Sequence, residues 1–283
     1  MRDGWLTRDG VRLHWREWEP AEAAAAPPLF CLHGLSSNSM YWARLAARFP
    51  HRRVVALDQR SHGLSDRPEA GYAFEELAAD AARAIAELEV ERPLILGHSW
   101  GAAVALALAA AQVDSIAGLA HLDGPLRSFS NLMSWDQASV VMQPPLKHYA
   151  NLEEAFAEQR GYLEDGWAED LQAFVEAGLI QDAEGYALPL TAGIRLQILK
   201  ALFDFDEEAL WPRLAASAVL IAQAERAPAA IADFKRQSAE IVAKMLPSAE
   251  IKWYPSAHDI PLHLPDQLAA DIDALASRAA VAK

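Results

Sequence analysis

The feature that most constrains this chain is the pentapeptide Gly97-His98-Ser99-Trp100-Gly101, which stands between two apolar runs. The run before it, Pro93 to Leu96, is typical of a short buried strand, and the alanine-rich run from Ala102 to Ala111 is typical of a tightly packed helix. Small residues at positions 97 and 101 let such a strand and helix approach closely, and the serine between them takes a strained backbone conformation. The turn lifts the hydroxyl above the sheet edge, beside the positive end of the helix dipole. We therefore predict that Ser99 is a nucleophile.

Strands and helices alternate on both sides of this turn. The buried-strand runs are residues 29–32, 53–57, 93–96, 116–122, 218–221 and 251–254. Helical spacing of apolar residues occurs at 39–49, 74–88, 102–111, 231–245 and 265–276. Residues 5–18 alternate around Asp9-Gly10, which predicts an amino-terminal hairpin, and Ala21 to Pro28 is a low-complexity linker. The pattern predicts an α/β fold, with a mostly parallel sheet covered on both faces and an active site at the carboxyl ends of its strands.

From Leu126 to Leu214 this alternation stops, no strand run is visible, and helical periodicity dominates. We therefore predict a core domain formed by residues 1–125 and 215–283 and a helical cap, or lid, formed by residues 126–214. The aromatic residues of this segment are Trp135, Tyr149, Phe156, Tyr162, Trp167, Phe174, Phe203, Phe205 and Trp211. Together with Trp42 and Trp100 they favour an apolar substrate pocket, although aromatic side chains at helical spacing more often belong to a core.

Charge and composition limit the classes of molecule that the chain is expected to bind. Of its 283 residues, 52% are hydrophobic and 23% are charged, which is typical of a globular protein. The net charge of −14 argues against binding to nucleic acid or an anionic membrane, and favours an uncharged small substrate. The single cysteine, Cys31, can form no internal disulfide, and no signal-peptide or transmembrane run is visible. We expect a soluble, cytoplasmic protein.

A serine hydroxyl needs a base, which is nearly always histidine, to remove its proton. Of the nine histidines, His258 has the best position, because it lies in the loop that follows the last strand. That loop and Ser99 share one sheet edge if both strands are parallel. His263 is the weaker candidate, because it lies beyond Pro261 and nearer the last helix.

The loop that opens at Gly34 would bring the backbone N–H of Leu35 beside Ser99. Together with the N–H of Trp100 it would form an oxyanion hole with two donors. We expect His33 to support this loop by hydrogen bonding rather than to transfer protons. No histidine or acidic spacing matches a metal site, and the glycine order at 97–101 does not fit a dinucleotide-binding turn. No metal or cofactor is expected.

Four stretches together resemble one known family: His33-Gly34, Asp58 to Ser65, Gly97 to Gly101 and Ala257 to Pro261. The chain resembles a serine member of the α/β-hydrolase superfamily, of the esterase, lipase and cofactor-free perhydrolase kind. This resemblance implies an eight-stranded, mostly parallel sheet, a helical cap after the sixth strand, and the chain order nucleophile, acid, histidine. It also implies that the loop from Asp58 to Asp66 is structural. Dehalogenases and epoxide hydrolases of the superfamily carry aspartate at the turn, so Ser99 excludes both.

The acid departs from the common pattern of the family. The usual position, in the loop after the seventh strand, falls on Ala227, and a methyl group cannot orient an imidazole. Some branches carry the acid at the end of the sixth strand instead, and that position is Asp123 here. We predict Asp123 as the acid, with Glu225 as the alternative and the absence of a working acid as a third possibility.

The resemblance and the residues together predict a cofactor-independent serine hydrolase that cleaves carboxylic esters of modest size, with Ser99, His258 and Asp123 as its catalytic triad. Lactone opening, carbon–carbon bond hydrolysis, amide or peptide cleavage and perhydrolysis use the same residues and stay open as alternatives. A protein that keeps this fold but only binds a ligand is an alternative of another class. The missing acid at the common position is the only feature in its favour.

Overall fold

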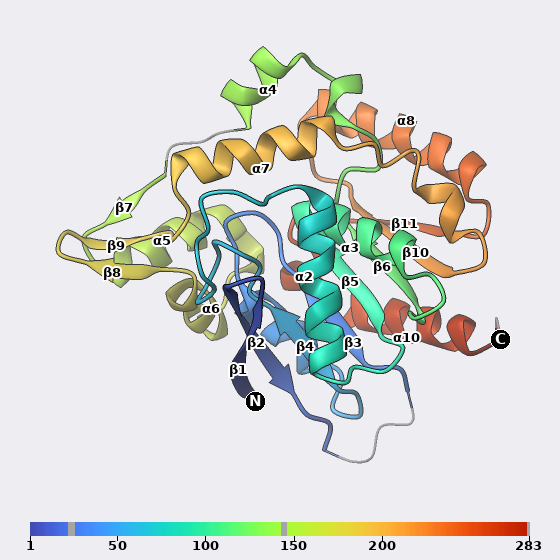
Figure 1. The fold of residues 1–283 in the computed structure, drawn as a ribbon. Helices are drawn as coiled ribbons and strands as arrows, with labels where there is room; N and C mark the ends of the chain where they lie inside the picture. The colour runs from blue at the N-terminus through green and yellow to red at the C-terminus, as the bar shows by residue number, and fades with distance from the viewer. Residues whose placement is uncertain (22–25, 143–145, 282–283) are drawn as a thin grey trace.

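The computed structural model describes residues 1–21, 26–142 and 146–281, and within them the chain forms an eight-stranded sheet (Figure 1). The strands lie in the order β1 (Arg2–Arg8), β2 (Val11–Trp18), β4 (Val54–Leu57), β3 (Leu29–Leu32), β5 (Leu94–His98), β6 (Gly118–Leu122), β10 (Ala218–Ala224), β11 (Glu250–Tyr254). The pairs β1·β2 and β2·β4 are antiparallel, and every other neighbouring pair is parallel. The predicted fold class is confirmed, and β3, β5, β6, β10 and β11 end at one edge of the sheet.

Helices cover both faces of this sheet. The described helices are α1 (Ala43–Ala46), α2 (Phe74–Glu87), α3 (Trp100–Ala111), α4 (Trp135–Val141), α5 (Leu152–Leu163), α6 (Gln172–Ala177), α7 (Ala192–Asp204), α8 (Ala229–Met245), α9 (Ile260–His263) and α10 (Pro265–Val281). One core packs α2, α3 and α8 against the sheet, and a second core packs α1 and α10 against the opposite face. In the described parts of the chain, no helix combines the length and the apolar character that a membrane crossing requires.

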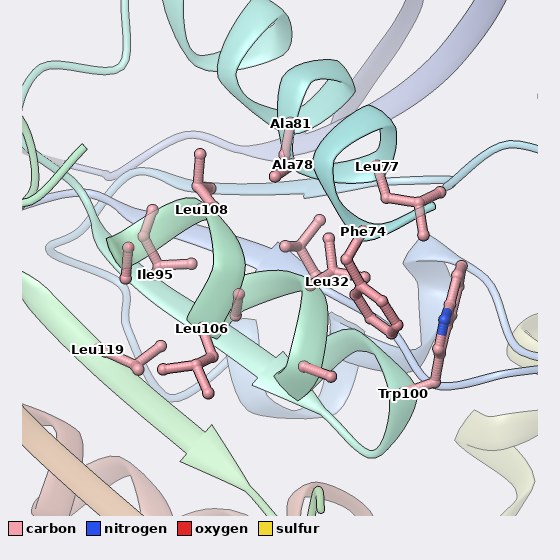
Figure 2. Close-up of a cluster of buried hydrophobic side chains, with 14 of the residues drawn as sticks. Leu32, Phe74, Leu77, Ala78, Ala81, Ile95, Trp100, Leu106, Leu108 and Leu119 are labelled. Carbon is pink, nitrogen blue, oxygen red and sulfur yellow. The ribbon is translucent and has the colours of Figure 1, made fainter. Parts of the chain in front are cut away.

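The central strands β3 and β4 are apolar along their whole length, because both faces of the sheet are buried there. In β3, Phe30 and Leu32 belong to the core under α2 and α3, whereas Leu29 and Cys31 belong to the core under α10. Figure 2 shows the first of these cores, where Leu32 and Ile95 of the sheet meet side chains of α2 and α3. A strand with only one buried face would alternate between apolar and polar residues, so this pattern is that of a central parallel strand.

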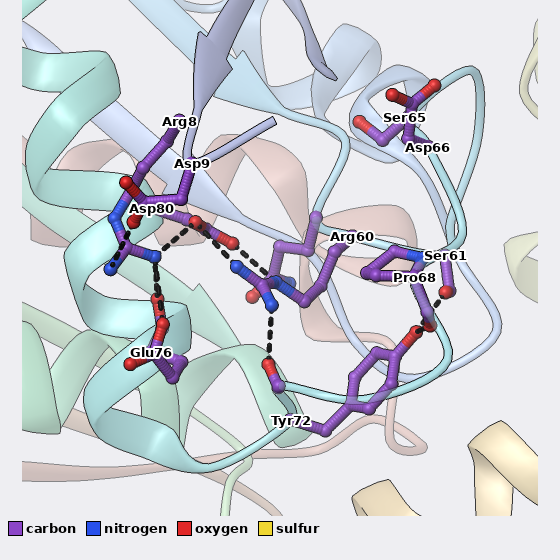
Figure 3. A network of polar contacts seen from close by, with 12 residues as sticks. Arg8, Asp9, Arg60, Ser61, Ser65, Asp66, Pro68, Tyr72, Glu76 and Asp80 are labelled. Atoms are coloured by element: carbon purple, nitrogen blue, oxygen red, sulfur yellow. Dashed lines mark hydrogen bonds and ion pairs between the residues drawn. The ribbon is translucent and has the colours of Figure 1, made fainter. Parts of the chain in front are cut away.

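The amino-terminal hairpin is confirmed at the predicted turn, where Asp9 and Gly10 both have positive φ angles, of 50° and 81°. A buried ion-pair network ties this hairpin to the rest of the fold (Figure 3). Asp80 of α2 accepts hydrogen bonds from Arg8 at 3.0 Å and from Arg60 at 2.7 Å. Within the predicted linker, residues 22–25 lie outside the described residues.

The segment between β6 and β10, residues 126–214, is called the insertion from here on. It contains α4 to α7, and Figure 1 shows α4 and α7 over one end of the sheet. The prediction that it holds no strand was wrong, because it also forms a small sheet of β7 (His148–Tyr149), β9 (Gly185–Ala187) and β8 (Ile180–Asp182). These strands are too short to show a period of two residues.

Turn chemistry creates the hairpin of β8 and β9. The Asp182 carboxylate accepts hydrogen bonds from the backbone N–H groups of Glu184, at 2.8 Å, and of Gly185, at 3.1 Å. Gly185 has a φ of 135°, which a residue with a side chain rarely adopts. The sequence signal was therefore the Asp-x-x-Gly turn and not the strands beside it.

Candidate active site

Ser99 lies in the turn between β5 and α3, as the sequence predicted. Its φ of 56° and ψ of −123° place the backbone in a strained region that costs about 1–3 kcal/mol. A Cβ added at Gly97 would lie 2.3 Å from the carbonyl oxygen of Gly101, and one added at Gly101 would lie 2.3 Å from that of His33. Both distances are too short for any side chain. The strand and the helix can therefore cross at this turn only because both flanking residues are glycine.

Three side chains from separate strand ends form one chain of hydrogen bonds. His258 Nε2 lies 2.9 Å from Ser99 Oγ, and His258 Nδ1 lies 2.7 Å from Asp123 Oδ2. Asp123 directly follows β6, and His258 follows β11, so parallel strands of one sheet bring both residues to the edge where Ser99 lies. A carboxylate can only accept, so the imidazole proton is on Nδ1 and Nε2 is free to accept from the Ser99 hydroxyl.

The local charges favour this arrangement of protons. Burial raises the pKa of the Asp123 carboxyl, but the hydrogen bonds and charges of His258 and Lys235 outweigh it, so the pKa lies below its usual value. Burial lowers the pKa of His258, but the hydrogen bond to Asp123 and the charges of Asp259 and Asp123 outweigh it and raise the net pKa. The site therefore combines an ionised acid with an imidazole that is a stronger base than usual.

The end of β10 holds the acid in place, although it supplies no carboxylate itself. The backbone N–H of Ala224 donates to Asp123 Oδ1 at 2.7 Å, and Lys235 of α8 donates to the same oxygen at 2.5 Å. Glu225, the alternative acid, is exposed, and in residues 1–21, 26–142 and 146–281 no hydrogen bond joins it to His258. Sequence reasoning missed Lys235, because nothing in the pattern of α8 relates that residue to Asp123.

The loop after β3 lies against Ser99. A Cβ added at Gly34 would lie 3.1 Å from Ser99 Cβ, and Leu35 lines the same cavity as Ser99 and Trp100. Trp100 is the first residue of α3, so its backbone N–H has no carbonyl partner within the helix. The two predicted oxyanion donors, Leu35 and Trp100, therefore belong to two segments that line the same cavity as Ser99.

Buried histidines support this loop, as expected for His33. His33 Nδ1 donates to the carbonyl oxygen of Gly34 at 2.8 Å, and its Nε2 accepts from the backbone N–H of Gln59 at 3.1 Å. His62 Nε2 accepts from the backbone N–H of Ser36 at 3.1 Å, and burial lowers the pKa of His62 to about 3. Neutral rings at both positions provide the acceptors that fix the loop.

The charged loop from Asp58 to Asp66 has a structural role, as the family resemblance implied. Asp58 is completely buried and accepts hydrogen bonds from His14 at 2.8 Å and from the backbone N–H of Ser39 at 2.5 Å. Burial by itself would raise the pKa of the Asp58 carboxyl. These contacts and the charge of Arg16 outweigh that effect and lower the pKa, so the carboxyl stays ionised. His263, the weaker candidate base, pairs with Asp165 at 3.3 Å.

Two cavities with different linings meet at Ser99 and His258, and residues of the insertion contribute to both. The apolar pocket, of about 490 Å³, is lined mainly by Leu126, Phe129, Leu199, Leu202, Ile231 and Phe234. The polar pocket, of about 400 Å³, includes Ser36, Ser37, Tyr41, Glu158, Gln159 and Arg195. Among the described residues, no group of three His, Cys, Asp or Glu side chains is arranged to hold a metal ion.

Of the aromatic residues singled out in the sequence, three are buried in the cores and three are partly buried against them: Trp42, Trp100 and Trp211, and Trp167, Phe174 and Phe205. Of those in the insertion, Tyr162 and Phe174 line the two pockets. Trp211 is completely buried and donates its indole N–H to the carbonyl oxygen of Leu126 at 2.9 Å. Trp42 is also completely buried, in the core on the α10 face, whereas Trp100 contributes to the apolar pocket. Helical spacing alone did not separate these two environments.

Comparison with known proteins identifies the fold. A model of the alpha/beta hydrolase fold matches residues 27–159, which include the loop after β3, the Ser99 turn and Asp123. The chain has the α/β-hydrolase fold. The crystal structure of E-2-(acetamidomethylene)succinate hydrolase is similar over 96% of this chain and 99% of its own, with a TM-score of 0.78 and 22% identity. At that identity the likeness concerns the fold.

Two curated relatives cover the chain differently. A 2-(acetamidomethylene)succinate hydrolase of Mesorhizobium japonicum is 36% identical over 103 residues, 36% of this chain and 37% of the relative. Lipase LipV of Mycobacterium tuberculosis is 26% identical over 267 residues, 93% of this chain and 97% of the lipase. The more similar relative is therefore matched over little more than a third of its length.

Proposed function

We propose that this α/β-hydrolase is a serine hydrolase that cleaves carboxylic esters of modest size through an acyl-enzyme. The observation that carries the proposal is the unbroken chain of hydrogen bonds from Ser99 through His258 to Asp123, with distances of 2.9 and 2.7 Å. A serine in a strained turn, a base within hydrogen-bond distance and a buried acid behind the base are together the arrangement that nucleophilic catalysis requires.

In the proposed mechanism Ser99 Oγ attacks the ester carbonyl while His258 Nε2 takes its proton. Asp123 orients the imidazole and stabilises the imidazolium that forms. The backbone N–H groups of Leu35 and Trp100 stabilise the negative charge on the carbonyl oxygen, which is the largest single contribution in many such reactions. His258 then gives its proton to the leaving alcohol. A water molecule, activated by the same imidazole, releases the acid and regenerates Ser99.

The two cavities favour a substrate with unlike ends. The apolar pocket, with Leu199 and Leu202 in its wall, suits an alkyl or aryl group on one side of the scissile bond. The polar pocket, with Arg195 and Glu158 in its wall, suits a group that forms hydrogen bonds. Because α5 and α7 supply these side chains, we also propose that the insertion acts as a cap that selects the substrate.

The experiment that tests this function is hydrolysis of p-nitrophenyl esters from acetate to decanoate, with labelling by a fluorophosphonate probe measured in parallel. Turnover and labelling that both disappear in Ser99→Ala would support the esterase proposal. Labelling without turnover on any chain length would reject simple esters and retain the nucleophile. A chain that shows neither would reject the proposal and favour a protein that only binds a ligand.

A second candidate is hydrolysis of another bond in a small carboxylate substrate. The observation in its favour is the Arg195 guanidinium, which lies in the polar pocket and donates to Ser36 Oγ at 2.7 Å. The similar hydrolase of Mesorhizobium japonicum is named for a succinate derivative, which is a dicarboxylate. Turnover of 2-(acetamidomethylene)succinate in the absence of p-nitrophenyl ester hydrolysis would favour this candidate over the esterase.

A further inference from the structure

The acid of the site has a third partner that the mechanism does not use. Asp123 Oδ2 faces His258, and its other oxygen, Oδ1, accepts from Lys235 Nζ at 2.5 Å and from the backbone N–H of Ala224 at 2.7 Å. Lys235 Nζ also donates to the carbonyl oxygen of Ala224 at 2.7 Å. The ammonium thus joins the end of β10 to the acid at the end of β6.

This contact is buried rather than a surface ion pair. The Lys235 side chain is 13% exposed and the Asp123 side chain is 4% exposed. An ammonium loses several kcal/mol of hydration when it enters such a site, so a neutral donor would complete the hydrogen bonds of Oδ1 at lower cost. What the ammonium adds is a positive charge that acts directly on Asp123 and, through it, on His258.

The charged and titratable neighbours of Asp123 and His258 come from every element around them: His98 of β5, His121 of β6, Tyr41, Tyr162 of α5, Asp259 before α9 and Arg226 after β10. Burial lowers the pKa values of His98 and His121 to about 4, so both rings are neutral near pH 7. Burial and Asp259 raise the pKa values of Tyr41 and Tyr162, so both phenols are neutral too. Lys235 is therefore a cation in direct contact with the acid, opposed by the negative charge of Asp259.

We infer that Lys235 is a positioning residue of this site: its ammonium holds the Asp123 carboxylate ionised and facing His258, and its charge extends the working range of His258 as a base to lower pH. The inference rests on the proposed function, because it concerns how fast Ser99 is acylated. The inference also states what an acid at the end of β6 needs from its surroundings. A carboxylate there needs a donor from the β10 side, and Ala224 and Lys235 supply it.

The test compares variants that separate charge from hydrogen bonding. Lys235→Met removes both, Lys235→Gln keeps a donor without the charge, and Lys235→Arg keeps the charge. Lys244→Met is the matched control, because Lys244 is an exposed cation near the end of the same helix. For each variant the rate constant of Ser99 labelling by diisopropyl fluorophosphate is measured from pH 5 to pH 9. This small probe makes the result insensitive to changes in the substrate pockets.

We expect the acid limb of this profile to move up by about 0.5–1 pH unit in Lys235→Met and Lys235→Gln. The limb should stay at the wild-type pH in Lys235→Arg and in Lys244→Met. Unmoved limbs in both neutral variants, with wild-type labelling at pH 8, would overturn the inference and leave the proposed function intact. Thermal melting of each variant identifies one that does not fold, and Lys235→Gln then provides the result if Lys235→Met is lost. A wild-type chain that is not labelled at any pH would overturn the proposed function and, with it, this inference.

Discussion

The helix that follows Ser99 and the helices that form the cavity walls differ in how they are held. In α3, ten of the twelve residues are buried, from Trp100 to Ala110, so the helix is packed on every side. In α5, which contributes to both cavities, only Ala155 and Leu163 of twelve residues are buried, and in α7, which also contributes to both, five of thirteen residues are buried. A residue at the start of α3 cannot move without disturbing the core that α3 shares with α2 and the sheet, whereas the exposed residues of α5 and α7 can change with little effect on the fold.

This contrast separates two tasks. The groups that we propose for the chemistry lie at strand ends in the rigid region, where a shift of 1 Å would misalign them. The groups that we propose for substrate selection lie mainly in the insertion, where we expect a change to alter the pocket and to leave the hydrogen bonds of Ser99, His258 and Asp123 intact. Substitutions in the first region should therefore change the rate, and substitutions in the second should change the preference.

The largest effect is expected for Ser99→Ala. Loss of the nucleophile should reduce kcat on p-nitrophenyl butyrate by at least about 10⁴-fold, because only binding and the oxyanion donors would remain. Steady-state kinetics measures this, and circular dichroism checks that the strained turn still folds. Residual activity within ten-fold of the wild type would mean that another group performs the attack.

Asp123→Asn should reduce kcat by about 10³–10⁴-fold, because an amide can hold the imidazole in the wrong tautomer and cannot stabilise the imidazolium. Glu225→Gln is the matched control, since it also converts a carboxylate to an amide and should leave kcat unchanged. The two variants are compared on the same ester at pH 8. A large loss of activity in Glu225→Gln instead would mean that the catalytic acid is Glu225, at the end of β10.

The pH dependence of kcat/KM tests the contact between His258 and Asp123, and the change in activity that we expect is smaller. His258 acts as a base only when neutral, and its pKa is raised above the usual 6.5 by Asp123 and Asp259, although burial opposes this. Activity should therefore decline about ten-fold per pH unit below a midpoint that lies above pH 6.5. A midpoint below 6.5, in protein that circular dichroism shows to be folded, would contradict the contact between Asp123 and His258.

In the insertion, Leu199→Ala should enlarge the apolar pocket and raise the kcat/KM ratio of decanoate to acetate about ten-fold, with a smaller change for acetate itself. Leu196→Ala serves as the control, because Leu196 is exposed on the same helix. The ratio is measured with both esters in a single buffer. An unchanged ratio would show that acyl chains do not enter this pocket.

The smallest effect is expected for Asp182→Ala, in the hairpin of β8 and β9. The substitution removes the acceptor of two backbone N–H groups, so we expect it to lower Tm by only about 2 °C. Activity on p-nitrophenyl butyrate should not change. A large loss of activity with a small change in Tm would mean that the insertion is coupled to the chemistry, against the separation drawn above.

Much of the fold could be predicted because its signals are local. The strands β3, β5 and β6 are continuous apolar runs, and Asp9-Gly10 demands positive φ angles whatever surrounds it. The strands of the insertion were missed because they have two or three residues each and depend on pairing rather than on their own pattern. The two cavities could not be predicted either, since their walls combine helices that are far apart in the chain.

By itself, the sequence determined the strand–turn–helix around Ser99, because glycine at positions 97 and 101 is a steric requirement that can be stated without knowing the rest of the chain. It also gave Asp123 and Glu225 as the candidates for the acid. Only the tertiary structure decided which carboxylate meets His258, because that depends on the order of strands in the sheet, where β6 lies between β5 and β10. The same packing decided the partner of Lys235. The sequence does not show which carboxylate this ammonium contacts, because the contact exists only when α8 packs against the end of β10.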